Sequence, residues 1–207
     1  LGHSEGGSIA LMLAAEGKAD FVISLAGMVA SGSETLLDQN RRALQMTGMH
    51  ESEINNYCRF LADAYAAVVN DMPLPSPDNY CLSAGLKQNA SMLSASLKTP
   101  YMKYFLGMNV SDILGSVKCP VMALNGTKDT QVDCDRNLSL LRQGLSGGYT
   151  FADESSVNVV KAEIGLNHLF QHCRTGEVSE YKEIEETFSP EVLTEMITWL
   201  HLRLSQK

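Results

Sequence analysis

The chain has 207 residues, with 16 Lys and Arg against 24 Asp and Glu, and so a net charge of −8 at pH 7. Hydrophobic residues make up 44% and charged residues 19%, which is typical of a globular domain with a substantial core. The acidic balance repels phosphate backbones, so we expect no nucleic-acid partner. No apolar run reaches the roughly 20 residues of a membrane-spanning helix, so we expect no membrane partner either.

Residues 1–30 predict a helix followed by a buried strand. Small and apolar residues over 6–15 fit a closely packed helix, with Gly17 as its C-cap. The short apolar run Phe21–Ala26 ends at Gly27 and predicts a strand. The chain opens without Met, basic segment or signal peptide, so we expect it to begin inside an element.

Residues 31–106 differ in composition and show no β-like run. Helical patterns cover 33–46, 51–69 and 79–97, with Gly48 and the proline-rich stretch 72–77 between them. We therefore expect a helical lid inserted between two strands.

Residues 107–207 return to an alternating pattern. Pro120–Gly126 and Val157–Gly165 predict strands, the second more alternating and so nearer an edge, and a helical pattern covers 136–145. Strand and helix alternating at this spacing predict an α/β class with a parallel sheet. A last helix is expected from Ser189 and Pro190, an N-cap and first-turn pair. Five Cys residues without CxxC or zinc spacing predict free thiols, and a cytoplasmic location is favoured.

The pentapeptide Gly2–Gly6 matches G-x-S-x-G, with a predicted helix directly after it. This pattern places a serine on a sharp turn that exposes its hydroxyl, so Ser4 is the candidate nucleophile. The helix N-terminus directs its dipole and free amides at developing negative charge, and the backbone N–H of Glu5 is the expected oxyanion donor.

A serine nucleophile needs a base and a group that orients the base. Asp129 and His168 each lie just beyond a predicted strand, where open parallel sheets place their active sites. The order Ser4, Asp129, His168 follows the nucleophile-acid-histidine order of one hydrolase architecture. Asp133 and Asp135 compete as the acid, although either residue could cap the following helix. His172 competes as the base.

Other roles for these residues are disfavoured. His3 is expected to pack at the elbow, with its side chain directed away from that of Ser4. The His168/His172 pair lacks the Glu of H-E-x-x-H, and the aspartates fail the EF-hand spacing, so no metal is expected. The glycines do not form G-x-G-x-x-G, which argues against dinucleotide binding.

With these residues the chain resembles the C-terminal portion of an alpha/beta hydrolase, of the carboxylesterase and dienelactone-hydrolase-like type with a helical lid. The resemblance rests on GHSEGG at 2–7, PVMALNGTKDTQV at 120–132 and GLNHLFQ at 165–171. It implies that Ser4 is the nucleophile, His168 the base and Asp129 the orienting acid. It also implies hydrolysis of a small-molecule carboxylic ester through an acyl-enzyme, without metal or cofactor.

The resemblance also implies that the N-terminal strands of the sheet, and the loop with the second oxyanion donor, are absent from this sequence. We expect about three parallel strands with an apolar edge uncovered, and hence homo-oligomerisation through that edge or poor solubility. Two alternatives to an esterase stay open. One is an amidase or aminopeptidase on the same scaffold, and the other is a catalytically inert hydrolase fragment.

Overall fold

The computed structural model describes residues 1–145, 149–150 and 158–205. The chain divides into two units, one formed by Leu1–Ala30 with Asn109–Lys207 and the other by Ser31–Met108. The first is an α/β unit and the second is all-helical. In each unit, a backbone hydrogen bond joins the two points at which the chain enters and leaves that unit. Ser111 N–H donates to the Val29 carbonyl at 3.0 Å in the first, and Gly32 N–H donates to the Met108 carbonyl at 3.0 Å in the second.

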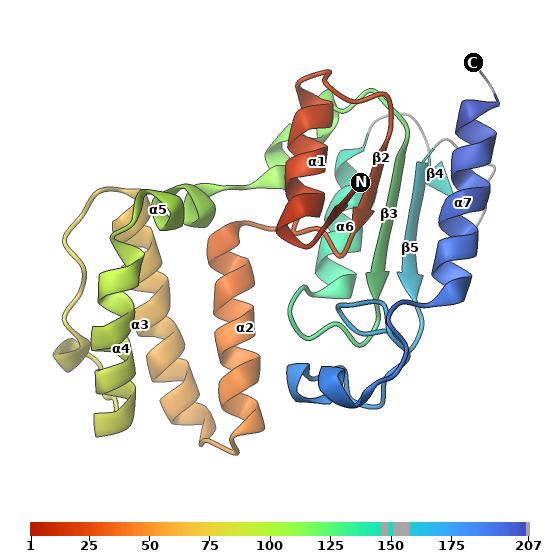
Figure 1. The fold of residues 1–207 in the computed structure, drawn as a ribbon. Helices are drawn as coiled ribbons and strands as arrows, with labels where there is room; N and C mark the ends of the chain where they lie inside the picture. The colour runs from red at the N-terminus through yellow and green to blue at the C-terminus, as the bar shows by residue number, and fades with distance from the viewer. Residues whose placement is uncertain (146–148, 151–157, 206–207) are drawn as a thin grey trace. The chain divides into compact units, whose positions relative to one another are not determined.

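The α/β unit is built on a parallel sheet (Figure 1). Its strands are β1 (Gly2–His3), β2 (Val22–Leu25), β3 (Val121–Gly126), β4 (Tyr149–Thr150) and β5 (Asn158–Glu163). Their order is β1-β2-β3-β5-β4, and all four pairings are parallel. The predicted α/β class with a parallel sheet is therefore confirmed. The strands predicted from apolar runs correspond to β2, β3 and β5; Val157 of the third prediction lies outside the described residues. The two-residue strands β1 and β4 are too short to produce a periodic pattern.

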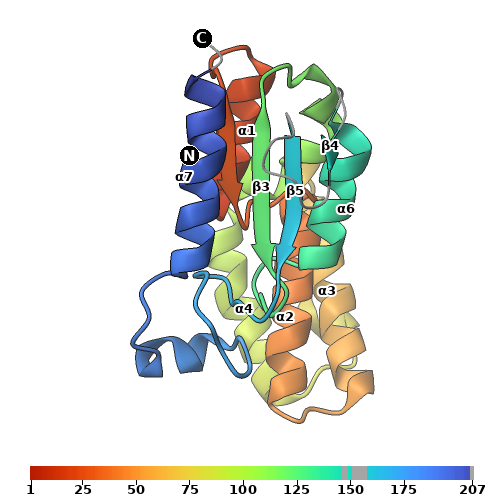
Figure 2. The same cartoon turned by 90° about the vertical axis from the view of Figure 1, so that its right-hand side faces the viewer.

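Different helices cover the two faces of this sheet (Figure 2). Successive side chains of a strand point to opposite faces. Ile23 and Met122 point to the face covered by α7 (Pro190–Leu204), where they pack in one cluster with Trp199. On the other face Gly7 of α1 (Glu5–Ala15) lies against Ser24 of β2. The helix α6 (Cys134–Gly144) packs on β3 and β5. The 3₁₀ segments η2 (Val110–Ser116) and η3 (Val178–Glu183) complete this unit.

The helical unit contains α2 (Gly32–Met46), α3 (Glu51–Val69), α4 (Ala84–Leu97) and α5 (Pro100–Gly107), with a 3₁₀ turn η1 (Pro77–Asn79). Aromatic and leucine side chains form its core, among them Phe60 and Leu61. The third predicted helix begins later than expected, because Pro77 favours a separate 3₁₀ turn and the chain is extended at Tyr80. The prediction also missed α5, although its start is typical: Thr99 caps it and Pro100 occupies its first turn.

Capping explains where several elements begin. Ser31 and Glu34 form a capping box at the start of α2. Ser189 accepts a hydrogen bond from Val192 N–H, with Pro190 in the first turn of α7, as the sequence predicted. Within the described residues, no helix combines the length and the apolar character needed to cross a membrane.

Candidate active site

The turn after β1 holds Ser4 in a strained conformation. Ser4 has φ 55° and ψ −124°, a region that residues with a side chain rarely adopt. It precedes the first residue of α1, Glu5, so the Glu5 backbone N–H belongs to the N-terminus of that helix. The Ser4 hydroxyl does not cap the helix. This geometry is the strand-turn-helix elbow that the G-x-S-x-G pattern requires.

The glycines of the motif permit a close approach of backbone to backbone. A Cβ on Gly2 would lie 1.9 Å from the Gly6 carbonyl oxygen, and a Cβ on Gly7 would lie 2.7 Å from Ser24 Oγ. Any larger residue at either position would push α1 away from β1 or β2. The shape of the elbow therefore depends on glycine at positions 2 and 7, which lets α1 pack directly against β1 and β2.

The strand register brings the ends of β1, β2, β3 and β5 to one edge of the sheet. His3 lies opposite Leu25, Leu25 opposite Leu124, and Gly126 opposite Glu163. Ser4 N–H continues the pattern by donating to the Leu25 carbonyl at 2.8 Å. The residues that follow these strands, including Ser4, Asp129 and His168, therefore emerge at the same edge.

Asp129 and His168 form a buried pair at this edge. His168 Nδ1 lies 2.8 Å from Asp129 Oδ2, and the side chains are 5% and 0% exposed. A carboxylate accepts only, so the imidazole carries its hydrogen on Nδ1 and leaves the Nε2 lone pair available as a proton acceptor. This is the tautomer that a general base next to a serine needs.

The carboxylate of Asp129 is held by three further donors. Oδ1 accepts the backbone N–H groups of Gln131 at 2.8 Å and Val132 at 2.9 Å. The side-chain amide of Asn125 donates to Oδ2 at 3.0 Å. These bonds fix the plane of the carboxylate toward the imidazole.

An asparagine turn shapes the backbone around His168. The Asn167 side-chain oxygen accepts the N–H groups of Leu169 at 2.9 Å and Gln171 at 3.0 Å. Its amide donates to Gln171 Oε1 at 2.9 Å, and Phe170 takes a positive φ of 59° within the turn. Asn167 is fully buried, so this network defines the position of the histidine loop, residues 165–173.

The acid loop, residues 126–132, is bonded directly to the histidine loop. Thr127 Oγ1 accepts Gly165 N–H at 2.9 Å, and Lys128 N–H donates to the Leu166 carbonyl at 2.9 Å. The Lys128 ammonium donates to the carbonyls of Cys173 and Arg174, both at 2.9 Å. The two loops that carry the acid and the base are thus one bonded assembly.

His3 also reaches the histidine loop. Its Nε2 lies 2.7 Å from the His168 carbonyl oxygen, and the two imidazole rings are tilted by 50° with centroids 4.6 Å apart. Because His3 directly precedes Ser4, this contact brings the elbow and the candidate base together. Sequence reasoning placed His3 at the elbow but missed this contact.

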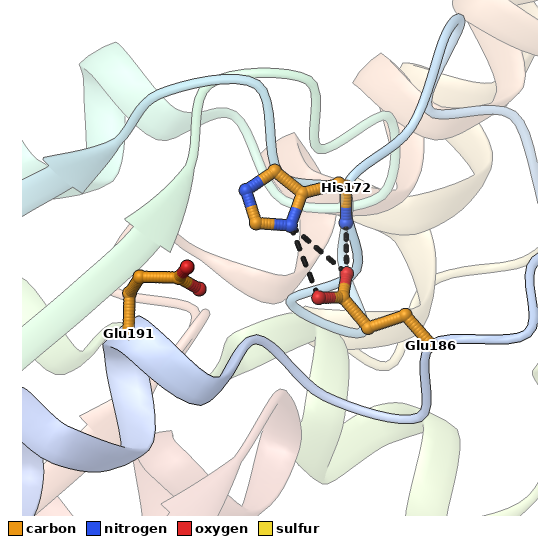
Figure 3. A group of neighbouring side chains, drawn as sticks. All are labelled: His172, Glu186 and Glu191. Atoms are coloured by element: carbon orange, nitrogen blue, oxygen red, sulfur yellow. Dashed lines mark hydrogen bonds and ion pairs between the residues drawn. The ribbon is translucent and has the colours of Figure 1, made fainter.

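The competing acids and the competing base have other roles. Asp133 caps α6 by accepting Arg136 N–H at 2.8 Å, and Asp135 is exposed in the first turn of that helix. His172 Nδ1 faces Glu186 at 3.0 and 3.1 Å, and Glu191 lies nearby at the start of α7 (Figure 3).

The group formed by His172, Glu186 and Glu191 is the set of described residues whose atoms could hold a cation, since they lie within 4.8 Å of one another. Each carboxylate already has a structural partner. Glu186 accepts His172 N–H at 2.5 Å. The pKa of Glu191 is lowered because its own backbone N–H and the Ser189 hydroxyl donate to it. The His172–Glu186 bonds therefore join the histidine loop to the segment before α7, whereas Glu191 bonds locally at the start of α7.

The thiol near the acid loop is not a rival nucleophile. Cys134 is buried, and its Sγ lies 3.5 Å from the Asn125 carbonyl. Burial, with the neighbouring carboxylates Asp135, Asp129 and Asp133, raises the pKa of this thiol to about 12. A thiol at this pKa is protonated at neutral pH and is a poor nucleophile.

Sequence reasoning missed the residues that support the candidate triad. Asn125 and Asn167 lie among the residues that suggested the resemblance, but nothing in the one-dimensional pattern assigns a hydrogen-bond partner. The signal available was their type: an asparagine beside a turn commonly bonds to local backbone groups.

No protein-family model matches the chain, and no curated protein matches it. Solved structures do match. A proline iminopeptidase from Mycobacterium smegmatis is 11% identical with a TM-score of 0.46, covering 100% of this chain and 66% of its own. A monoacylglycerol lipase from Paleococcus ferrophilus is 16% identical (TM-score 0.43; 98% and 66% covered). An esterase from a Rhodococcus species is 17% identical (TM-score 0.43; 97% and 63% covered).

The chain thus spans about two thirds of the length of these structures. The chain itself has a parallel sheet, a strained serine elbow between a strand and a helix, and an acid and a histidine beyond two further strand ends. Over the described residues, the chain has the architecture of the alpha/beta hydrolases.

Proposed function

We propose that this chain carries the nucleophile, base and acid of a serine hydrolase that cleaves carboxylic esters through an acyl-enzyme. The observation that carries the proposal is the buried Asp129–His168 hydrogen bond of 2.8 Å, formed at the sheet edge where the strained elbow presents Ser4. The contact between His3 and the His168 carbonyl supports it, because it ties the elbow to the base.

In the proposed reaction, His168 Nε2 accepts the Ser4 hydroxyl proton as Oγ attacks the ester carbonyl. Asp129 stabilises the imidazolium that forms, and the Glu5 N–H at the start of α1 donates to the oxyanion. The alcohol leaves with the proton from His168. Water, deprotonated by the same nitrogen, then hydrolyses the acyl-Ser4 ester.

The intact mass of the chain after treatment with a fluorophosphonate tests the nucleophile. We expect one adduct on the parent and none on Ser4→Ala. Ser91→Ala is the matched control, since Ser91 is an exposed helical serine that bonds only its own helix in the described structure. This control is expected to label like the parent. Hydrolysis of a small aryl ester by Ser4→Ala should fall by about 10⁴-fold or more.

An adduct that persists in Ser4→Ala would place the reactive serine elsewhere. A folded parent that forms no adduct would favour the inert-fragment alternative. If the parent is labelled, an ester and an amide of the same acyl group distinguish esterase from amidase or aminopeptidase. We expect the ester to be the better substrate, and a preference for the amide would reassign the reaction.

A further inference from the structure

We infer that His3 is a positioning residue for the base, acting through the main-chain carbonyl of His168. The inference rests on the proposed function, which gives His168 its role. It adds a residue that the nucleophile, base and acid do not include. His3 is exposed, and no requirement of the core accounts for an imidazole there.

The contact fixes which atoms of His3 carry hydrogen. His3 Nε2 lies 2.7 Å from the His168 carbonyl oxygen. A carbonyl oxygen only accepts, so Nε2 must be the donor. The ring also lies edge-on to Phe170, with centroids 6.5 Å apart and planes at 70°. The imidazole is thus held on two sides by the histidine loop.

The bond from His3 supplies a donor to the His168 carbonyl, which the other bonds of the histidine loop do not. The Asn167 side chain accepts the N–H groups of Leu169 and Gln171, which both follow His168 in the chain. Among the described residues, His3 is the hydrogen-bond partner of the His168 carbonyl itself. His168 is buried, with 4% exposure, so removing the donor would leave its carbonyl poorly satisfied. The His168–Leu169 peptide would then be held through its Leu169 N–H, without the bond to its carbonyl.

The same short strand therefore positions both reacting groups. His3 pairs with Leu25 in the sheet, and Ser4 N–H donates to the Leu25 carbonyl. One dipeptide thus presents the nucleophile and holds the peptide of the base. The separation of Ser4 and His168 is then set by adjacent residues instead of by the long loops that connect them.

His3 is not a second base in this arrangement. Its Nε2 faces a carbonyl, and the carboxylate that orients an imidazole, Asp129, is bonded to His168. Its effect on the reaction must pass through the position of His168.

The test compares two replacements of His3. His3→Gln keeps an N–H donor near the position of Nε2, and His3→Leu removes the donor at similar volume. His201→Leu, at an exposed histidine in the last turn of α7, is the control. We measure the low-field proton resonance of His168 Nδ1–H, the rate of fluorophosphonate labelling, and kcat and KM for an aryl ester.

We expect His3→Leu to broaden the Nδ1–H resonance and to lower kcat and the labelling rate by about 10- to 100-fold, with KM within twofold. His3→Gln should restore the resonance and most of the rate. An unchanged resonance together with an unchanged labelling rate in His3→Leu would overturn the inference. Equal losses in the Gln and Leu variants would also overturn it, because the effect would then not depend on the donor.

The resonance does not require turnover, so the two proposals can fail separately. If the parent is not labelled but its Nδ1–H resonance is lost in His3→Leu and kept in His3→Gln, the hydrolase proposal fails and the positioning role stands. If the Leu variant does not fold, His3→Asn replaces it. Its amide is too short to reach the carbonyl, so it should behave as a donor-free variant.

Discussion

Ser4 is held by its surroundings in a backbone conformation that is unfavourable for a residue with a side chain. Its φ of 55° is unfavourable for any residue with a Cβ. The sheet and α1 enforce this value, because Ser4 N–H is bonded to Leu25 and the flanking Gly2 and Gly6 pack against each other. Strain of this kind costs about 1–3 kcal/mol and persists only where the surroundings impose it.

The strain predicts an order of stability between two inactive variants. Ser4→Gly relieves the strain and Ser4→Ala keeps it. The free energy of unfolding of Ser4→Gly should therefore be about 1 kcal/mol higher than that of Ser4→Ala. Thermal or urea unfolding measures the difference. Gly and Ala also differ as N-caps, so the same pair at Thr99, an N-cap with φ −79°, provides the correction. An Ala variant as stable as the Gly variant, after this correction, would argue against strain at Ser4.

At the scale of residues, the sequence predicts the candidate site residues but not the hydrogen-bond partners that hold them in place. The motif spacing and the strand ends were enough to propose Ser4, Asp129 and His168, and the last two are hydrogen-bonded in the structure. Two side chains help to hold them: Asn125 bonds to Asp129 four residues later, and His3 bonds to the distant His168 carbonyl. The spacing of the motifs specifies neither bond. A polar residue's partner is determined by the fold, so it cannot be derived from residue type alone.

At the scale of elements, the acid loop and the histidine loop depend on close packing with the segment that follows them. A Cβ on Gly176 would lie 1.8 Å from the Lys128 carbonyl oxygen, and Gly176 has a φ of +82°. The Thr130 hydroxyl donates to the Gly176 carbonyl at 3.1 Å. Gly176 therefore helps to fix the acid loop through its contacts with Lys128 and Thr130.

Gly176→Ala should move the acid loop. We expect a loss of about 2–3 kcal/mol in unfolding free energy, from the clash with Lys128 added to the positive φ, and a lower rate of fluorophosphonate labelling. Gly48→Ala is the matched control, because Gly48 has φ +73° with open space around its Cβ position. It should lose only about 1 kcal/mol and leave labelling unchanged. Equal losses in both variants would exclude the clash.

The carboxylate of Glu180 binds the turn that contains Gly176, and this bond depends on pH. The Thr175 hydroxyl donates to it at 2.6 Å, and the backbone N–H groups of Thr175, Arg174 and Gly176 donate at 2.9, 2.8 and 3.0 Å. These bonds lower the pKa of Glu180 to about 2, against an ordinary value of 4.5. Its stabilising effect is therefore complete above pH 4.5 and disappears as pH falls toward 2.

Glu180→Gln should be less stable than the parent at pH 7, and the difference should shrink between pH 4.5 and about 2. Urea unfolding at a series of pH values measures this. Glu185→Gln, at an exposed glutamate of the same segment, is the control and should follow the parent. A difference that is constant with pH would show that the Glu180 carboxylate charge contributes nothing.

For the whole molecule, the long helices and the apolar strands could be predicted better than the helix boundaries and the short elements. The long helices of 31–106 and the strands β2, β3 and β5 have clear periodic or apolar patterns, and the structure contains them. The start of α4 and the existence of α5 were missed, because proline and capping residues at 76–83 and 99–100 allow several local structures. The strands β1 and β4 form through pairing with their neighbours, which a pattern two residues long cannot reveal.

The end of the sheet at β1 is the surface where we propose self-association. Exposed Leu1, Ile9 and Leu13 line a hollow of about 190 Å³ beside Phe21 and Val22. An edge strand next to exposed apolar side chains is a site for pairing between chains.

Light scattering after size exclusion, over a range of concentrations, should therefore show dimers or larger species that Ile9→Lys converts toward monomer. Ile197→Lys, at a residue of α7 that is 53% exposed, is the control and should associate like the parent. A parent that is monomeric throughout the concentration range would contradict the proposal.

The way the chain leaves and re-enters the α/β unit has an evolutionary consequence. Val29 and Ser111 are joined by a backbone hydrogen bond of 3.0 Å, although the whole helical unit lies between them in sequence. The free energy of closing a loop grows only slowly with its length, so these two points can hold an insertion of almost any size. Helical segments of different length and sequence could thus be exchanged at this junction while the α/β unit keeps its fold.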